Sequence, residues 1–317
     1  EMYRLCDEQG LIVWAEIPML KMTESEALLE NACSQLEELI LQNIHHPSIC
    51  FWGIQNEIAM FGENQGMYER VKRLGDLAKQ LDPSRISSCA NLFCVKNDSV
   101  LNKLTEAVGY NIYFGWYYGE MKDSEAFVEK FHEDNPHIPL GITEYGVDCN
   151  LAFHSQDPKV KDYSEEFQAL YHETVYPMFK SKPYIWGTYV WNLYDFSSEI
   201  RDEGGLKHKN GKGLITFDRK IKKDAYYYYM AQWSSKPFVK IAQSRFVKRE
   251  QPEICITVYS NQKEVDLYVN QNCYKGFSES GVFHFYKIAL GQGENRVKAV
   301  SGEWEDEAVF CGVTEKE

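Results

Sequence analysis

Two glutamates stand directly after short apolar runs of strand length, and their side chains could do chemistry together. The run that begins at Ile49 ends in Asn56 and Glu57, and the run that begins at Leu140 ends in Glu144. Such runs indicate strands buried on both faces, as in a parallel sheet covered by helices. In an α/β barrel the carboxyl ends of the strands carry the chemistry. Two carboxyl groups on one rim are the pair that a glycosidase needs, one as proton donor and one as nucleophile or base.

The elements that must position these glutamates alternate between strands and helices. This alternation favours parallel strands joined by right-handed crossovers. An open doubly wound sheet would usually carry a glycine-rich phosphate loop, which the sequence lacks. We therefore expect an α/β fold, an N-terminally truncated (β/α)8 TIM barrel over residues 1–236 with about six of its eight strands present. The expected strands are residues 11–18, 49–57, 85–91, 107–113, 139–144 and 184–192, and the expected helices are residues 23–44, 64–81, 123–134, 163–180 and 223–233.

A different pattern begins beyond residue 236. The apolar runs become short and partly alternating, and turn residues such as Ser260-Asn261 and Gly291-Gln292-Gly293 separate them. This pattern is typical of an all-β sandwich of immunoglobulin type. We expect that domain over residues 237–317, after a polar, glycine-rich loop at 202–213 and a closing helix of the barrel.

Composition excludes some partners and leaves others open. The chain has 317 residues, 44% of them hydrophobic and 14% aromatic, so it can bury a sizeable core. The aromatic residues suit stacking on sugar rings and a sandwich core equally well. A formal net charge of −13 argues against nucleic acid or an anionic membrane surface as a partner. No apolar run reaches the length of a transmembrane helix, and no signal peptide is visible.

The nine cysteines form no C-x-x-C pair, and several lie inside apolar runs, for example Cys50 and Cys255. They indicate reduced thiols of a cytoplasmic protein rather than a disulfide framework or a metal site. The stretch from Glu57 to Met60 offers no histidine ligand. We therefore expect no catalytic metal and no cofactor.

Several motifs in a fixed order resemble glycoside hydrolase family 2, the β-galactosidase and β-glucuronidase group. The resemblance covers the whole chain, and it implies that the chain corresponds to the C-terminal part of a family member. Sandwich domains and the first two barrel strands precede this part in the family. The motifs are residues 45–49, 52–57, 142–146, 190–196 and 210–220.

The resemblance implies roles for five residues. Glu57 corresponds to the general acid/base, and Glu144 to the nucleophile that forms a covalent glycosyl-enzyme with retention of configuration. Asn56 corresponds to the side chain that hydrogen-bonds the sugar 2-hydroxyl. Tyr113 matches the tyrosine that hydrogen-bonds the nucleophile, and Trp191 forms a stacking wall of the pocket. For Asn56, Tyr113 and Trp191 the alternatives are a turn residue, a rim aromatic and a core tryptophan.

Other candidates follow less directly. Glu16 and His46 lie at or near strand ends and are candidates for contacts with sugar hydroxyls, although His46 fits a structural role before Pro47 equally well. Trp116 and Tyr117 follow Tyr113 and are candidates for the aglycone side of the pocket.

Asn210 and Lys212 form an Asn-x-Lys pattern that resembles the carboxylate-reading motif of β-glucuronidases. Because β-galactosidases of the group often carry the same pattern, the flanking residues 201–205 and 222–227 decide the expectation. They favour a retaining exo-β-galactosidase with a β-galactoside substrate; the alternatives are a β-glucuronidase and a catalytically inert carbohydrate-binding fragment. Open strand edges at 11–18 and 184–192 favour association, so a homo-oligomer is possible.

Overall fold

The computed structural model describes residues 1–21 and 24–313, which fall into two compact units. The first unit comprises Glu1–Tyr145 and Pro177–Val190, and the second comprises Gly146–Tyr176 and Trp191–Glu317. Each unit is taken by itself below.

The first unit contains one sheet of six strands in sequence order, and every neighbouring pair is parallel. This confirms the predicted run of six parallel barrel strands. The inner strands are largely buried because they are continuous apolar runs; all five residues of β4, for example, are buried, whereas every residue of the outer strand β6 is only half-buried. The strands are β1 (Val13–Glu16), β2 (Ile49–Asn56), β3 (Ile86–Leu92), β4 (Ala107–Asn111), β5 (Leu140–Tyr145) and β6 (Ile185–Val190).

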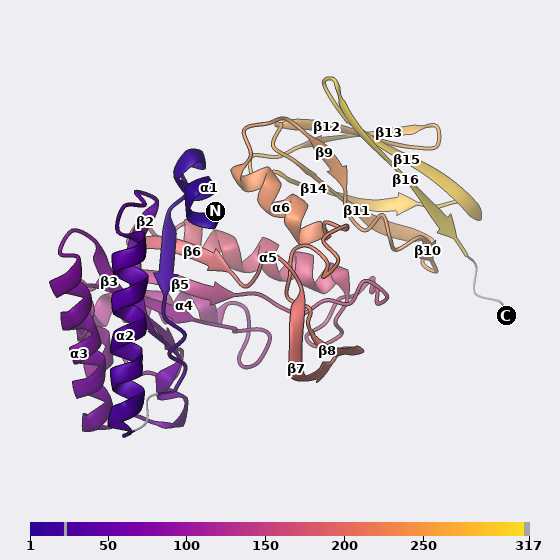
Figure 1. Ribbon diagram of the computed structural model, residues 1–317. Coiled ribbons are helices and arrows are strands. Elements are labelled where there is room, and N and C mark those ends of the chain that lie inside the picture. Colours follow the sequence, from indigo (N-terminus) through magenta and orange to yellow (C-terminus); the bar gives the residue numbers. More distant parts are fainter. Residues whose placement is uncertain (22–23, 314–317) are drawn as a thin grey trace. The chain divides into compact units, whose positions relative to one another are not determined.

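Helices connect these strands, and α2 and α3 run side by side in Figure 1. Arg73 of α3 donates to Glu26 of α2 at 2.8 Å. Helix α2 begins after Ser25, whose hydroxyl accepts from the Leu28 amide at 3.3 Å, as expected of an N-cap. Residue 23, where the sequence predicts the start of this helix, lies outside the described residues. The helices are α1 (Met2–Gln9), α2 (Glu26–Asn43), α3 (Gln65–Leu81), α4 (Asp123–Asp134) and α5 (Glu165–Lys180), with 3-10 turns η1 (Ile58–Phe61) and η2 (Val100–Lys103).

The second unit contains a hairpin whose turn and second strand fall in the predicted loop at 202–213. Strands β7 (Phe196–Glu203) and β8 (Leu206–Asn210) pair antiparallel. The turn between them is Gly204-Gly205, and both glycines have positive φ, 58° and 72°. Two-residue hairpin turns often need positive φ at both positions, which glycine adopts without steric cost. Helix α6 (Asp224–Trp233) follows.

The rest of the second unit is two antiparallel-rich sheets around one apolar core, as the alternating sequence pattern predicts. One sheet has the order β14-β11-β9 and the other β10-β16-β15-β12-β13. In β12 the alternate residues Val265, Leu267 and Val269 are buried in the shared core. The strands are β9 (Val239–Ile241), β10 (Lys248–Arg249), β11 (Glu253–Ser260), β12 (Glu264–Val269), β13 (Asn272–Phe277), β14 (Val282–Ala289), β15 (Gly293–Ser301) and β16 (Trp304–Gly312).

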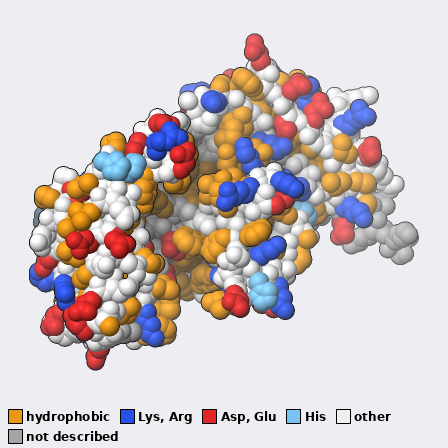
Figure 2. All heavy atoms as spheres, viewed as in Figure 1, with side chains coloured by type: hydrophobic (Ala, Val, Ile, Leu, Met, Phe, Trp, Pro, Cys, Tyr) orange, Lys and Arg blue, Asp and Glu red, His pale blue; other side chains and the backbone are white. Residues whose placement is uncertain are grey.

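The surface carries both signs of charge. Figure 2 shows acidic and basic side chains interspersed with apolar ones on the face viewed, so the net negative charge of −13 is not gathered into one patch there. In the part of the chain that the structure describes, we find no helix with the length and apolar character needed to cross a membrane.

Candidate active site

Glu57 stands at the carboxyl end of β2 in a left-handed backbone conformation, with φ 53° and ψ 24°. This conformation costs a residue other than glycine roughly 1–2 kcal/mol. Two hydrogen bonds hold it: the Glu57 amide donates to the Ala90 carbonyl at 2.8 Å, and the Ile58 amide donates to Gln55 Oε1 at 3.4 Å. The extended backbone of β2 therefore ends at Asn56, and Glu57 lies in the turn that follows, at the carboxyl end of the strand.

The Glu57 carboxyl group is half-buried and has a neutral hydrogen-bond partner. Asn111 Nδ2 donates to Glu57 Oε1 at 3.0 Å and to Asn56 Oδ1 at 2.9 Å. Burial raises the pKa of Glu57 above its ordinary value, and the hydrogen bond from Asn111 opposes part of that rise. A raised pKa keeps a carboxyl group protonated closer to neutral pH, which is what a general acid requires.

Glu144, the second predicted carboxylate, lies on β5 and accepts a hydrogen bond from a buried tyrosine. The Tyr113 hydroxyl donates to Glu144 Oε2 at 2.5 Å. Burial, and then the charge of Glu144, raises the pKa of Tyr113 well above its ordinary value, so this hydroxyl keeps its proton. A donated hydrogen bond favours the charged form of the carboxyl group. The structure therefore brings Tyr113 and Glu144 together as the sequence predicts.

A residue that the sequence analysis did not select connects the two glutamates' strands. Asn111 ends β4 and is fully buried, and its Oδ1 accepts from the Thr143 hydroxyl at 2.7 Å. Thr143 directly precedes Glu144 on β5. Alternate strands contribute side chains to the same layer of a barrel interior, which explains how Asn111 of β4 reaches β2 past β3. Asn111 thus hydrogen-bonds to Asn56 and Glu57 on one side and, on the other, to Thr143, the neighbour of Glu144.

Glu16 lies on β1 opposite Gly53 of β2. Its Oε2 accepts from Trp14 Nε1 at 3.0 Å, and burial raises its pKa to about 7. A Cβ atom at Gly53 would lie 2.7 Å from the Glu16 side chain, so this close approach requires glycine. The described hydrogen bond of Glu16 is to a neighbouring tryptophan, and it does not join Glu16 to the network around Glu57.

His46 lies at the other end of β2 from Glu57. Its Nδ1 is 2.5 Å from Asp7 Oδ2, and the same carboxylate accepts from the Ser48 amide at 2.9 Å. His46 precedes the eight-residue strand and Glu57 follows it, which corresponds to a separation of about 25 Å along the strand. The structure does not bring His46 to the carboxylates; its contacts are those of a structural histidine.

The loop after β4 places its two aromatic candidates differently. Trp116 is buried, with 2% of its surface exposed, whereas Tyr117 is 44% exposed. The Tyr117 ring lies 5.3 Å from that of Tyr113, centroid to centroid. Tyr117 therefore lies beside the tyrosine that holds Glu144, while Trp116 supports the loop from inside.

The second unit contains the remaining candidates. Trp191 is half-buried and packs edge-on against Phe196 at 5.8 Å between centroids. Asn210 Oδ1 accepts from the Lys212 backbone amide at 3.0 Å. The Lys212 ammonium group is almost fully buried and lies 2.6 Å from Asp148 Oδ2.

Asp148 is a second residue that the sequence analysis missed. Besides Lys212, it accepts from Arg201 Nη2 at 2.9 Å and from the Gly211 amide at 3.0 Å. Although burial alone would raise it, these partners, Lys212 foremost, lower the pKa of Asp148 below its ordinary value. Asp148 follows Glu144 by four positions, which in the sequence is only an acidic residue after a strand. No local signal distinguishes it.

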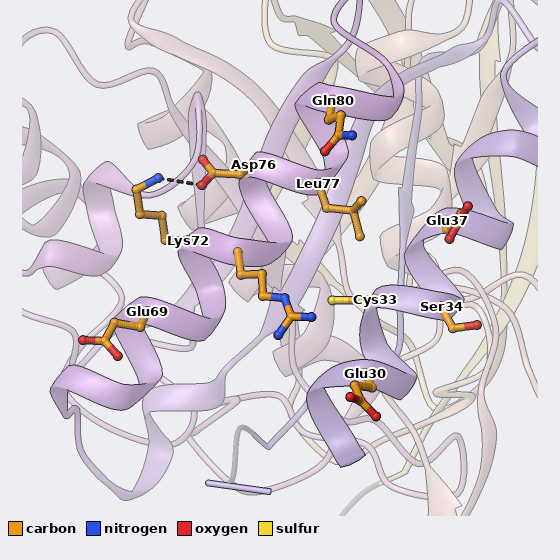
Figure 3. Close-up of a pocket in the computed structure, with 10 residues that line it drawn as sticks. Glu30, Cys33, Ser34, Glu37, Glu69, Lys72, Asp76, Leu77 and Gln80 are labelled. Atoms are coloured by element: carbon orange, nitrogen blue, oxygen red, sulfur yellow. Dashed lines mark hydrogen bonds and ion pairs between the residues drawn. The ribbon is translucent and has the colours of Figure 1, made fainter. Parts of the chain in front are cut away.

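A groove of about 610 Å³ lies apart from these residues, between α2 and α3 (Figure 3). Its lining is mainly charged, and Lys72 and Asp76 pair across one turn of α3 at 2.6 Å. None of the strand-end glutamates lines it. The groove therefore offers no chemistry comparable with that of Glu57 and Glu144.

Comparisons with known proteins show which family the chain resembles. A family model described as "Glycosyl hydrolases family 2, TIM barrel domain" matches residues 1–236. A β-glucuronidase of Bacteroides fragilis is 36% identical over 95% of this chain and 45% of its own length. An FMN-binding β-glucuronidase structure from Facaelibacterium prausnitzii L2-6 is 40% identical with a TM-score of 0.95, over 98% of this chain and 48% of that one.

A putative β-galactosidase structure from Bacteroides fragilis is 37% identical with a TM-score of 0.92, over 100% of this chain and 48% of that one. The chain thus spans about half the length of the relatives that it matches.

Proposed function

Because the chain belongs to glycosyl hydrolase family 2, we propose that it supplies the two catalytic carboxyl groups of a retaining β-glycosidase. Glu57 is the general acid/base and Glu144 is the nucleophile. The observation that carries this assignment is the contrast between them: burial favours the protonated form of Glu57, while the Tyr113 hydroxyl supports the anion of Glu144. A retaining glycosidase starts its cycle with its two carboxyl groups in these two states.

The reaction proceeds in two displacements. Glu144 attacks the anomeric carbon as Glu57 gives its proton to the leaving oxygen, so the glycosidic bond breaks and a glycosyl ester forms on Glu144. Glu57, now a carboxylate, then takes a proton from a water molecule. That water attacks the anomeric carbon, which releases the sugar and restores both carboxyl groups. Asn56 binds the sugar 2-hydroxyl, a contact that strengthens in the transition state.

The proposed substrate is a β-glucuronide. The Asn-x-Lys pattern of Asn210 and Lys212 resembles the carboxylate-reading motif of β-glucuronidases, in which the lysine pairs with glucuronate, and Asn210 Oδ1 accepts from the Lys212 backbone amide. Several curated relatives are named β-glucuronidase or putative β-glucuronidase, which supports the same choice. A β-galactoside is the second candidate, favoured by residues 201–205 and 222–227 and by the name of the putative β-galactosidase. The sequence analysis ranked these two in the opposite order.

We propose the domain organisation on similar grounds. Residues 1–236 are the catalytic barrel domain, which the extent of the family match supports. Residues 237–317 are an immunoglobulin-like sandwich, which the two sheets around one apolar core support. A cytoplasmic location and a homo-oligomer remain predictions.

Mechanism-based labelling of the purified protein tests the function. A 2-deoxy-2-fluoro glucuronyl fluoride should form a stable ester on Glu144, detected by mass spectrometry of the peptide that contains it. The variant Glu144→Gln is the control and should stay unlabelled. Labelling by the galactose-configured reagent alone would move the substrate assignment to β-galactosides. Absence of a Glu144 ester with both reagents would refute the proposed function.

A further inference from the structure

Asn111 forms hydrogen bonds with two of the proposed site residues, Asn56 and Glu57, and has no role in the proposed reaction so far. It is fully buried at the end of β4, between the strands that carry Glu57 and Glu144. Its Nδ2 donates to Asn56 Oδ1 at 2.9 Å and to Glu57 Oε1 at 3.0 Å, and its Oδ1 accepts from the Thr143 hydroxyl at 2.7 Å.

The orientation of this amide follows from its partners. A primary amide has two N–H donors and one carbonyl acceptor. Both donors of Asn111 are used, one on Asn56 and one on Glu57, and the Thr143 hydroxyl occupies the carbonyl. The two acceptors select this orientation, because the flipped amide would place its carbonyl against a carboxylate oxygen of ionised Glu57, and the Thr143 hydroxyl supports it by donating to Oδ1.

We propose that Asn111 is a positioning residue that selects the working atoms of both Glu57 and Asn56. Since Glu57 Oε1 accepts from Asn111, the proton for the leaving group is carried on Oε2. Since Asn56 Oδ1 also accepts from Asn111, its Nδ2 is the group turned toward the sugar 2-hydroxyl. This inference rests on the proposed function and adds to it a single residue that orients the acid and the 2-hydroxyl contact together.

No other side chain type provides the same set of contacts at this position. Aspartate would place a carboxylate beside Glu57 and could not donate to two acceptors. Serine or alanine would not span from β4 to β2. Leucine has the same number of side-chain heavy atoms and the same branching as asparagine but offers no donor, so it removes the hydrogen bonds while filling the position.

The other titratable groups close to Glu57 do not supply this orientation. Tyr113 and Tyr118 from the loop after β4 and Cys94 from the loop after β3 interact electrostatically with Glu57, and burial raises the pKa of all three, so they are neutral where Glu57 titrates. Glu144, which interacts with the same two tyrosines, is the charged group on this side, and as a carboxylate it has no proton to donate to Glu57. The Asn111 amide is therefore the donor that stabilises the Glu57 carboxylate against the effect of burial.

The test compares Asn111→Leu with Asn135→Ala, a matched variant of another buried asparagine in the same unit, whose amide donates to the Asn97 carbonyl. Asn111→Leu should lower kcat/KM about 100-fold, as loss of acid/base catalysis does. The alkaline limb of the pH profile of kcat/KM reports deprotonation of Glu57. In Asn111→Leu it should move to higher pH, because the hydrogen bond that lowers the pKa of Glu57 is gone. Discrimination between the substrate and its 2-deoxy analogue should fall as well.

Two further variants and one titration separate the outcomes. Thr143→Val should show the same changes in weaker form, and Thr143→Ser should restore wild-type behaviour. A carboxyl carbon NMR titration of Glu57 does not depend on turnover and should give a higher pKa in Asn111→Leu, with no change in Asn135→Ala. An unmoved Glu57 titration, or loss of activity with unchanged 2-hydroxyl discrimination, would overturn the inference. Failure of Glu144 labelling in the wild type would instead count against the proposed function.

Discussion

Glu57 and Asp148 are two shielded carboxyl groups with opposite electrostatic settings, one in each unit. Glu57 has a neutral amide as its hydrogen-bond partner, and burial raises its pKa. Asp148 lies between two cations, Lys212 and Arg201, and its pKa is lowered although burial acts in the other direction. Burial alone therefore does not decide how a carboxyl group behaves. Its partners decide whether it serves as an acid or remains an anion.

Asp148 and Glu57 also contribute to the free energy of folding with opposite signs. A carboxyl group whose folded-state pKa is lowered stabilises the protein above its unfolded pKa, about 3.9 for aspartate, and loses that contribution as pH falls through the folded value. Asp148 is of this kind. A group whose pKa is raised, such as Glu57, costs stability once it is ionised in the folded protein. The ionised carboxyl group of Asp148 thus stabilises the folded protein, whereas that of Glu57 destabilises it.

The largest effect is expected from neutralising Glu144, which the proposed mechanism requires as an anion. Glu144→Gln removes the nucleophile and should lower kcat by about 10⁵-fold or more, as loss of a covalent nucleophile does in other enzymes. Tyr113→Phe, which removes only the donor to Glu144, should cost about 100-fold. Steady-state kinetics with a nitrophenyl glucuronide measure both. Equal effects of the two variants would contradict the assignment of Glu144 as nucleophile.

Asp148→Asn should be strongly destabilising, because it removes the buried anion that pairs with Lys212 and Arg201. We expect a loss of about 3–5 kcal/mol in the free energy of unfolding, measured by denaturant titration at pH 7. Asp76→Asn is the control, since it breaks an exposed pair with Lys72 and should cost less than about 1 kcal/mol. A similar small loss in both variants would show that the Asp148 cluster is not energetically distinct.

Lys212→Gln tests whether the Lys212 cation binds the carboxylate of the substrate. Loss of this cation should reduce kcat/KM for a β-glucuronide at least about 30-fold, since a buried charge pair is worth about 2 kcal/mol or more. Hydrolysis of the matching β-galactoside, which has no carboxylate, should change much less. Equal loss on both substrates would assign Lys212 a structural role and favour the β-galactoside alternative.

The smallest effect concerns stability as a function of pH. Glu57→Gln should leave the free energy of unfolding at pH 8 within about 0.5 kcal/mol of the wild type or raise it, because it removes an ionised group with an unfavourable setting. The difference between wild type and Asp148→Asn should instead narrow below pH 4, as Asp148 takes up a proton. Denaturant titrations of the wild type and both variants, at pH 8 and below pH 4, measure these differences in the free energy of unfolding. A large destabilisation by Glu57→Gln would contradict this expectation.

The strands of the first unit and the two glutamates could be predicted because their signals are local. A continuous apolar run such as β2 indicates a strand buried on both faces, and a carboxylate at its end falls on the rim of a parallel sheet. The hairpin of β7 and β8 was missed because its residues are mostly polar and exposed, and its turn glycines were taken as a loop. His46 was selected for lying close to a strand, which does not say at which end of the sheet it lies.

The strand segments, the residues that end them and the family resemblance can be read from the sequence, because they depend on side chains adjacent in the chain. The hydrogen bonds of Asn111 to Asn56 and Glu57, and the pairing of Asp148 with Lys212, arise only in the folded chain. The first contacts join residues 54 and 55 positions apart, and the second joins residues 64 positions apart. Hydrogen bonds and charge pairs act over a few ångströms in space, so the protonation state of each carboxyl group is set by neighbours that its own segment does not contain.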